Sequence, residues 1–358
     1  MNVWFLLCKQ QYIMQKKLGL ILQYVIFLGG GIFLIWWQFS KMTPEELLKF
    51  KFALTNANYT IVIPIIILAL ASHVSRSVRW KILIEPMGYK PSLFNTFAVT
   101  MVGYLANSFV PRLGEILKCT MLGKYERIPV QKLIGTIVIE RIFDLVCYLF
   151  FILFTIIIQF SLVGNFVKDS ISKMIKPESG IALWGWILIL FLIVAFIILL
   201  VRFILKKYNS NKLVKRLSNF FAGLKEGITS IKKLKKRGWF IFHTLFIWSM
   251  YLLEIYIGFS AIKEVSHLGL NAACSVLTLA TFAMILTPGG IGTFPTAIFL
   301  VLGLYNIEQS TGEAFGWLMW GTTTFIILFF GILCFSLLYF INKNKRPTQF
   351  GKEIIDSV

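Results

Sequence analysis

Apolar stretches of about 20 residues recur along this chain, separated by more polar segments. A helix of that length, rising 1.5 Å per residue, crosses a hydrocarbon core of ~30 Å. The pattern therefore predicts an all-α, polytopic integral membrane protein. The candidate membrane segments are 18–37, 59–75, 94–110, 134–160, 183–204, 239–262, 271–305 and 314–341.

Two of these segments contain helix-breaking residues. Segment 94–110 runs into the sequence VPRLG, which ends at Gly114, and segment 271–305 is interrupted by TPGGIG, which ends at Gly292. Proline and glycine at such positions end a helix. We therefore expect two re-entrant helical hairpins, over 94–124 and 271–306, and about six full spans elsewhere.

Composition agrees with a membrane protein, since 57% of the 358 residues are hydrophobic and only 15% are charged. The net charge of +20 resembles that of a nucleic-acid-binding protein until the basic residues are placed. Twelve of the 36 lie between Arg202 and Arg237, in a loop between two spans. Such loops mark the cytoplasmic side and contact anionic lipid, so we expect anionic membrane lipids and no nucleic acid as partners.

The five cysteines have no paired spacing, so the sequence implies neither a disulfide framework nor a metal site, and we expect no cofactor. The first apolar stretch is longer than a signal-peptide core and lacks a cleavage pattern. We read it as a retained span.

The distribution of lysine and arginine predicts the topology. The segments 1–17 and 202–237 are both basic and both expected in the cytoplasm, so an even number of crossings separates them. Segment 94–110, basic on both flanks, is then the one that does not cross. This arrangement puts 28 basic residues inside and seven outside, whereas a rival with an outside N-terminus puts 11 outside. We expect the cell inner (cytoplasmic) membrane, with the tail 342–358 also cytoplasmic.

A repeat follows from these assignments. Spans 59–75 and 239–262 begin 180 residues apart, as do spans 134–160 and 314–341. Within the expected transmembrane domain 18–341, the repeat units 59–160 and 239–341 would each consist of a span, a hairpin and a span, in opposite orientations. Inverted repeats with broken helices are common in secondary transporters.

The basic segment 205–238 has apolar residues every three or four positions, which predicts an amphipathic helix lying on an anionic leaflet. A solvated loop is the alternative. The periodic residues are Leu213, Leu217, Phe220, Leu224, Ile228 and Ile231.

Charged residues gather in and beside the first unit. Arg76 and Arg79 share a helix face, with Trp80 suited to the headgroup zone; snorkelling arginines are the plainer reading. The first hairpin tip holds Asn107, Pro111, Arg112, Gly114, Glu115 and Lys118, and Arg112 could simply pair with Glu115. Span 134–160 begins with Glu140, Arg141 and Asp144. Glu140 and Asp144 repel each other unless cations lie opposite, so we expect Arg76, Arg79 and Arg112 as partners; the network is either a site or structural support.

The second unit offers a glycine-rich turn and one buried acid. Gly289, Gly290 and Gly292 let the backbone approach a ligand, and a half-helix starting near Thr293 would point its N–H groups at a phosphate. A plain hairpin turn is the alternative. Glu254, deep in span 239–262, is a functional candidate by default, for a proton or a cationic headgroup. The isolated His73, His243 and His267 are read as interfacial residues.

Taken in order, these motifs resemble the transmembrane domain family of lysylphosphatidylglycerol synthases, also called the flippase-like domain. The likeness covers roughly 18–341. It rests on Arg76, Arg79, Trp80, Asn107, Pro111, Arg112, Gly114, Glu115, Lys118, Glu140, Arg141, Asp144 and the turn from Pro288 to Gly292. In bifunctional members, the resemblance implies, this domain flips aminoacylated phosphatidylglycerol that a separate C-terminal domain makes.

The sequence departs from that pattern twice. Only the tail 342–358 follows the last span, so we expect no aminoacyl transfer. Where many relatives have a glutamate after the Gly-Gly-x-Gly turn, this chain has Thr293 to Thr296 (TFPT). Without that acid, an ordinary phospholipid or a polyprenyl-phosphate-linked lipid fits as well as a lipid with a cationic headgroup.

We therefore expect a flippase or transporter of an anionic lipid, with no catalytic residue. The lipid phosphate would contact Arg76, Arg79, Arg112, Lys118, Gly289, Gly290, Gly292 and Thr293, while Glu115, Glu140, Arg141, Asp144 and Glu254 would form a charge network or couple transport. One alternative is a membrane enzyme of lipid-linked glycan synthesis, although the 38–58 loop offers only Glu45 and Glu46 as carboxylates. Another is a scaffold for envelope-lipid biosynthesis enzymes.

Overall fold

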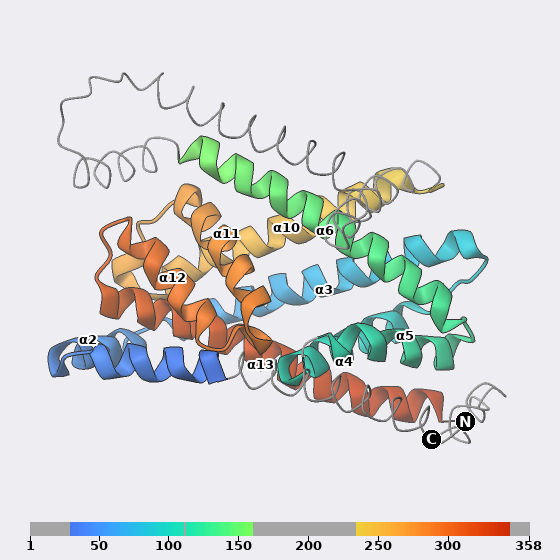
Figure 1. Ribbon diagram of the computed structural model, residues 1–358, viewed down its shortest axis with the longest axis horizontal. Coiled ribbons are helices and arrows are strands. Elements are labelled where there is room, and N and C mark those ends of the chain that lie inside the picture. Colours follow the sequence, from blue (N-terminus) through green and yellow to red (C-terminus); the bar gives the residue numbers. More distant parts are fainter. Residues whose placement is uncertain (1–28, 111, 160–233, 344–358) are drawn as a thin grey trace, which may run out of the picture.

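The computed structural model describes residues 29–110, 112–159 and 234–343, and within those ranges every regular element is a helix. A helix at 29–41 comes first. The longer helices that follow are α2 (Pro44–Thr55), α3 (Val62–Ile84), α4 (Leu93–Phe109), α5 (Leu113–Glu126), α6 (Val130–Ile158), α10 (Arg237–Gly258), α11 (Leu270–Leu286), α12 (Thr293–Gly303) and α13 (Gln309–Asn342). Figure 1 shows them as one elongated bundle.

Four helical stretches in the described part are long and apolar enough to cross a membrane: Tyr59–Met87, Val130–Ile158, Arg237–Ala261 and Gln309–Asn342. The all-α, polytopic prediction is confirmed. The predicted span 18–37 lies only partly within the described residues, and 183–204 lies outside them. Most of the predicted amphipathic segment 205–238 is outside them as well.

Both broken segments form helical hairpins. The first turns between α4 and α5, where Arg112 has a left-handed backbone (φ 67°). The second turns between α11 and α12, where Gly289, Gly290 and Gly292 all have positive φ (61°, 69° and 72°). An L side chain is strained in that region, which explains the three glycines.

The first hairpin is tight because two glycines face each other across it. A Cβ atom on Gly114 would collide with the carbonyl oxygen of Gly103. Asn107 closes the same turn, since its Oδ1 accepts a hydrogen bond from the Gly114 amide at 2.7 Å. The α4–α5 approach therefore depends on residues with no side chain at the crossing point.

The chain repeats the order of span, hairpin and span, with the second copy reversed. In Figure 1, α3 and α10 run antiparallel, as do α6 and α13, and the tips of the two hairpins point at each other in the middle of the bundle. A Cβ on Gly289 would lie 3.6 Å from the Cα of Ser108, so the tips touch.

The two units also exchange their last spans. Helix α13 packs against α4 of the first unit, and α6 packs against α11 of the second. Gly331 of α13 leaves no room for a Cβ beside Leu105. Each hairpin is therefore held by the other unit as well as by its own.

The ends of the bundle differ in charge. We call one the basic end, where α3 finishes and α10 begins; Lys236 pairs there with Glu85 at 2.8 Å. At the opposite end, α6 finishes beside the start of α11, since the Gln159 amide donates to the Asn271 carbonyl at 2.7 Å. Described basic residues near the basic end are Lys81, Lys90, Lys124, Arg127, Lys132, Lys235, Lys236, Arg237 and Lys343; those near the opposite end are Lys41, Lys49, Lys51 and Lys263.

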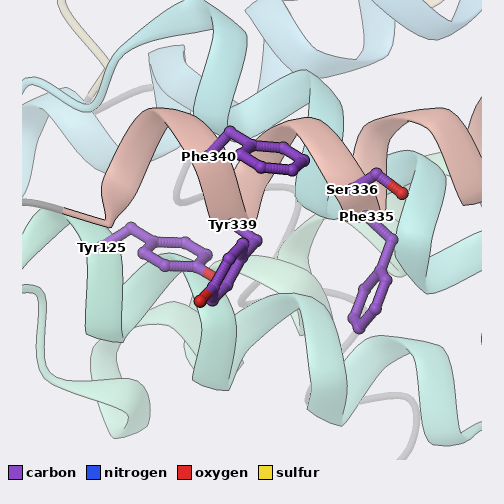
Figure 2. A pocket seen from close by; sticks show the side chains of 5 residues that line it. All are labelled: Tyr125, Phe335, Ser336, Tyr339 and Phe340. Carbon is purple, nitrogen blue, oxygen red and sulfur yellow. The ribbon is translucent and has the colours of Figure 1, made fainter.

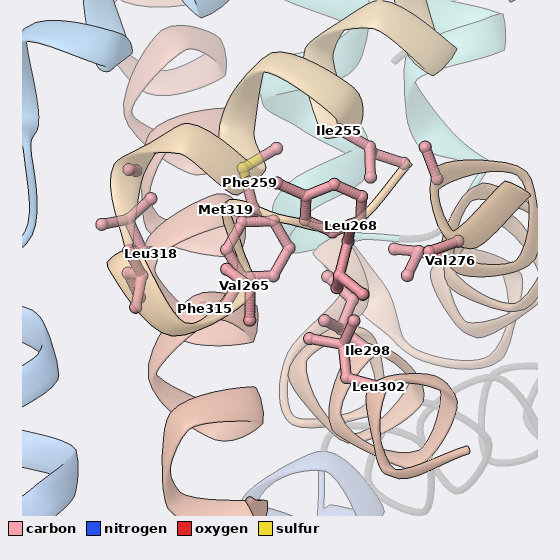
Figure 3. Packing of buried hydrophobic residues seen from close by; sticks show 14 of the residues in the cluster. Ile255, Phe259, Val265, Leu268, Val276, Ile298, Leu302, Phe315, Leu318 and Met319 are labelled. Carbon is pink, nitrogen blue, oxygen red and sulfur yellow. The ribbon is translucent and has the colours of Figure 1, made fainter. Parts of the chain in front are cut away.

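The largest apolar core lies toward the opposite end, among α10, α11, α12 and α13 (Figure 3). Phe259, Val265, Phe315 and Ile298 are fully buried there. Large apolar side chains such as Phe150 point outward instead, as expected of helix faces in contact with lipid.

The prediction that 38–58 is a loop is wrong, because this stretch contains α2. Thr43 and Glu46 form a capping box: the Thr43 hydroxyl accepts from the Glu46 amide, and the Glu46 carboxylate accepts from the Thr43 amide. Pro44 at the first helical position fits the same start signal. The two acids that the loop offered, Glu45 and Glu46, therefore lie in the first turn of a helix that packs against α13.

Candidate functional site

Seven charged side chains meet where α3, α5 and α6 come together, and we call them the charge cluster. Three are fully enclosed or nearly so: Arg79 and Glu140 have no exposed surface and Lys118 is 4% exposed. The members are Arg76, Arg79, Glu115, Lys118, Glu140, Arg141 and Asp144.

The two arginines of α3 face the two carboxylates of α6. Arg79 reaches Asp144 at 2.7 Å and Glu140 at 3.2 Å. Arg76 reaches Asp144 at 3.1 Å and Glu140 at 3.6 Å. The i, i+3 spacing on α3 and the i, i+4 spacing on α6 put each pair on one helix face, so the expected pairing is present.

Lys118 of α5 completes the surroundings of Glu140. Its Nζ is 3.3 Å from a Glu140 oxygen and 4.5 Å from the centre of the Trp80 ring. The Trp80 indole N–H is held in turn by the Thr136 hydroxyl at 2.8 Å. Trp80, expected at the headgroup level, is instead fully buried and supports the cluster.

Arg141 connects the cluster to the first hairpin. Its guanidinium lies 3.6 Å from Glu115 and 3.7 Å from Asp144, and the Arg141 side chain is 43% exposed. Asn107 donates to the other oxygen of Glu115 at 3.3 Å. Movement of the hairpin would therefore be felt at the arginines of α3 through Asp144.

Neutral side chains from α10 and α4 complete the site, and the sequence did not reveal them. The Tyr251 hydroxyl accepts from Arg76 at 2.9 Å, and the Thr244 hydroxyl accepts from Arg79 at 3.3 Å. The Tyr104 ring lies 6.0 Å from the Arg76 guanidinium. Tyr251 and Thr244 are more than 160 positions from their partners, so only the α3–α10 packing brings them together.

The cluster carries four positive and three negative charges, leaving one positive charge in excess. Three buried donors have no hydrogen-bond acceptor among the described residues: Nε of Arg76, Nε of Arg79 and the Tyr104 hydroxyl. Buried polar groups are nearly always satisfied, so unpaired donors beside a positive excess suit an anion.

A small polar pocket adjoins Tyr104, with space for about one water molecule. Its walls come from α4, α5 and α6. They consist of Thr100, Gly103, Tyr104, Asn107, Gly114, Glu115, Lys118 and Arg141. A larger ligand would enter only if the hairpin moved away from α6.

Arg112 is placed differently from the expectation. It lies at the exposed tip of the first hairpin and makes no ion pair with another described residue. Glu115, its expected neighbour, pairs with Arg141 instead. The expected partnership of Arg112 with Glu140 and Asp144 is therefore wrong; Lys118 and Arg141 fill that role, since the break leaves Arg112 outside the helix that faces α6.

The second hairpin turn is held by its own hydrogen bonds. The Thr293 hydroxyl donates to the Ala283 carbonyl at 2.9 Å and contacts the Thr287 hydroxyl at 2.7 Å. The Trp320 indole donates to the Gly289 carbonyl at 2.9 Å. Helix α12 begins at Thr293, as expected, but the Thr293 hydroxyl is already engaged within the turn.

Three other predicted positions are now located. Glu254 has a buried Oε1 atom with no partner among the described residues. His73 and His243, read as interfacial, lie between helices instead: the His73 ring is 5.0 Å from Tyr104, and His243 bonds the Ser75 hydroxyl at 2.8 Å. Both are drawn inward because α3 packs on α4 and α10.

A second hollow lies between the ends of α5 and α13 (Figure 2). It is lined by Tyr125, Phe335, Ser336, Tyr339 and Phe340. No charged side chain is among these lining residues, so the hollow offers a phosphate hydroxyl groups but no positive charge.

Comparisons with known proteins agree with one family. The chain matches the model described as the lysylphosphatidylglycerol synthase TM region over residues 20–340. It is 28% identical over 284 residues to the UPF0104 membrane protein MJ1595 of Methanocaldococcus jannaschii, covering 73% of this chain and 80% of that protein. It is 30% identical over 254 residues to the UPF0104 membrane protein MJ1078 of the same organism, covering 67% and 97%. No solved structure matches the chain.

Proposed function

This chain belongs to the lysylphosphatidylglycerol synthase transmembrane-region family, and from that premise we propose that it moves an anionic lipid between the leaflets of a membrane. The lipid would be a phospholipid or a polyprenyl-phosphate-linked lipid. The observation that carries the proposal is the charge cluster, whose members Arg76, Arg79, Lys118 and Glu140 are buried. It has one positive charge in excess, and three unpaired donors lie in it or beside it.

Burying this cluster costs free energy, which indicates that the charges serve a function. Each charge removed from water costs several kcal/mol before pairing, and the pairing usually returns about as much as it cost. Apolar side chains of similar volume would hold α3, α5 and α6 together at least as well. Retaining charge at this depth is understandable if the cluster binds an anion that must pass through the bilayer.

The arrangement of the hairpins supplies a mechanism for alternating access. The tips of the two hairpins meet in the middle of the bundle, and each hairpin opens toward a different end. In our proposal, one hairpin moves away from its neighbouring span to admit a headgroup while the other stays closed. The Arg141–Glu115 contact would transmit that movement to Arg76 and Arg79.

The proposed orientation places the basic end in the cytoplasm, in the inner membrane of the cell, with both termini on that side. The excess of lysine and arginine at this end supports it. The lipid phosphate would then enter the cluster from the leaflet next to the open side of the first hairpin.

The test is lipid movement in liposomes that contain the purified full chain. We expect fluorescent phosphatidylglycerol or a polyprenyl phosphate to change leaflet faster than in empty liposomes, and faster than labelled phosphatidylcholine. Equal rates with and without protein for all three lipids would leave the scaffold or the enzyme as the better reading.

Tyr104→Phe sharpens that test. The variant removes a buried hydroxyl that has no partner among the described residues, so folding should not weaken. If the hydroxyl donates to the phosphate, transport should fall roughly tenfold, as expected for losing a hydrogen bond to a charged group. Tyr339→Phe is the matched control because Tyr339 is exposed at the far end of α13, and it should transport normally.

A further inference from the structure

Four residues at the opposite end of the bundle, away from the charge cluster, have buried polar atoms with no hydrogen-bond partner among the described residues. They are Gln38, Ser310, Glu313 and Trp317. Gln38 and Ser310 are 1% exposed and Glu313 is 0% exposed. Both polar atoms of Gln38, the Ser310 hydroxyl, one Glu313 oxygen and the Trp317 indole N–H have no hydrogen-bond partner among the described residues. So many unsatisfied groups in one region require an explanation.

Three of them share one face of α13, since residues three and four apart on a helix are neighbours. Ser310, Glu313 and Trp317 follow that spacing. Gln309 belongs to the same face and donates to the first Glu313 oxygen at 2.9 Å, leaving the second oxygen free.

Gln38 comes from the helix at 29–41, whose buried face contains Gly31 and Gln38. Gly31 packs on the second hairpin tip, where a Cβ would lie 2.6 Å from the Ile291 carbonyl oxygen. Trp320 of α13 binds the same tip through Gly289. Gln38 follows Gly31 by seven residues, and Glu313 precedes Trp320 by seven residues. Each interval is about 10 Å along its helix, so Gln38 and Glu313 lie at the same distance from the second hairpin tip.

An aromatic contact confirms that the two helices adjoin at that level. The rings of Phe39 and Trp317 are 6.0 Å apart, and Phe39 also packs edge-on against Phe50 of α2. The buried polar atoms of Gln38 and Glu313 therefore lie where helix 29–41, α2 and α13 adjoin, and this is the region considered below.

We propose that this region is a binding site for a monovalent alkali cation. The Glu313 carboxylate, the Ser310 hydroxyl and the Gln38 amide oxygen supply the hard oxygen ligands that such ions prefer. The Trp317 indole, a donor only, would orient the carboxylate.

Charge selects the ligand. Glu313 accepts a hydrogen bond from the neutral Gln309 and pairs with no basic side chain in the described part of the chain. A water molecule would satisfy the hydroxyl, amide and indole but would leave the carboxylate charge uncompensated. One monovalent cation balances one buried carboxylate, whereas a lipid headgroup is too large for residues this enclosed.

The experiment measures thermal unfolding of the purified full chain in rising NaCl or KCl, with choline chloride keeping the ionic strength constant. Because an ion that binds only the folded state stabilises it, we expect a saturating rise of about 2–4 °C with Na⁺ or K⁺ and none with choline. The rise should disappear in Glu313→Gln. It should persist in Glu308→Gln, because the Glu308 carboxylate is exposed and pairs with Lys49.

Ser310→Ala protects the test against misfolding of the Glu313 variant. It removes one oxygen ligand and keeps the charge, so the ion concentration at half-saturation should increase several-fold. The site is disproved by equal melting in all three salts, or by a sodium-dependent rise that survives both Glu313→Gln and Ser310→Ala. The result does not depend on lipid transport, so either proposal can fail alone.

Discussion

Glu140 is the residue on which the charge cluster depends most. It is fully buried and contacts Arg76, Arg79 and Lys118. Its neighbours would be left with uncompensated positive charge if it were neutral. The main question for Glu140 is whether its charge stabilises the fold, takes part in binding the ligand, or does both.

Glu140→Gln should lower the free energy of unfolding by ~3–5 kcal/mol, because it removes one partner from a buried charge network. Thermal unfolding and yield in detergent measure this. If the variant melts like the native chain but has lost lipid transport, Glu140 is a ligand or proton site rather than a structural partner.

At Arg112, one substitution should change stability and transport in opposite directions. It occupies a left-handed backbone position (φ 67°) that suits glycine, so Arg112→Gly should raise the free energy of unfolding by about 1 kcal/mol. If the guanidinium at the hairpin tip binds the lipid phosphate, transport should fall at the same time. Arg127→Gly is the control: φ is 56° there too, at the end of α5, so stability should rise while transport is unchanged. Undiminished transport in Arg112→Gly removes Arg112 from the proposed phosphate site.

At the element scale, the first hairpin is the most constrained part of the fold. Gly114→Ala should cost ~1–3 kcal/mol, since the new methyl group collides with the Gly103 carbonyl and the backbones must separate. The matched control is Gly135→Ala in α6, which has nothing within 4 Å and should be neutral or slightly stabilising. Thermal unfolding of both variants compares them; equal melting temperatures would contradict the tight crossing.

The elements differ in how far their sequence predicts them. Both hairpins followed from local chemistry, since proline and glycine interrupt apolar segments too short for two spans. The Arg76–Asp144 pairing followed from helical spacing. Helix α2 was missed although Thr43, Pro44 and Glu46 form a recognisable start signal. Tyr251 could not have been found, because nothing local marks a tyrosine whose partner is 175 positions away.

At the scale of the whole molecule, the arrangement predicts which surfaces face the cytoplasm. In a cysteine-free background, a cysteine replacing Lys124 should react with an impermeant thiol reagent only after the cells are opened. A cysteine replacing Glu264, at the opposite end, should react in intact cells. The reverse pattern would invert the proposed orientation. Labelling of both Lys124→Cys and Glu264→Cys in intact cells would argue against the first hairpin as a re-entrant element.

Because the two units exchange their last spans, the first hairpin cannot complete its packing until α13 has been translated. Helix α4 needs α13, and their buried Asn95 and Asn342 bond each other at 3.0 and 3.3 Å. About 230 residues separate the end of α4 from the end of α13, and a ribosome adding ~5–20 residues per second needs roughly 10–45 s to make them. Throughout that interval the first hairpin exists without the helix that covers it, and Asn95 has only Glu126 and its own turn to satisfy it. The nascent chain is therefore most exposed to membrane proteases before the 34 residues of α13 emerge.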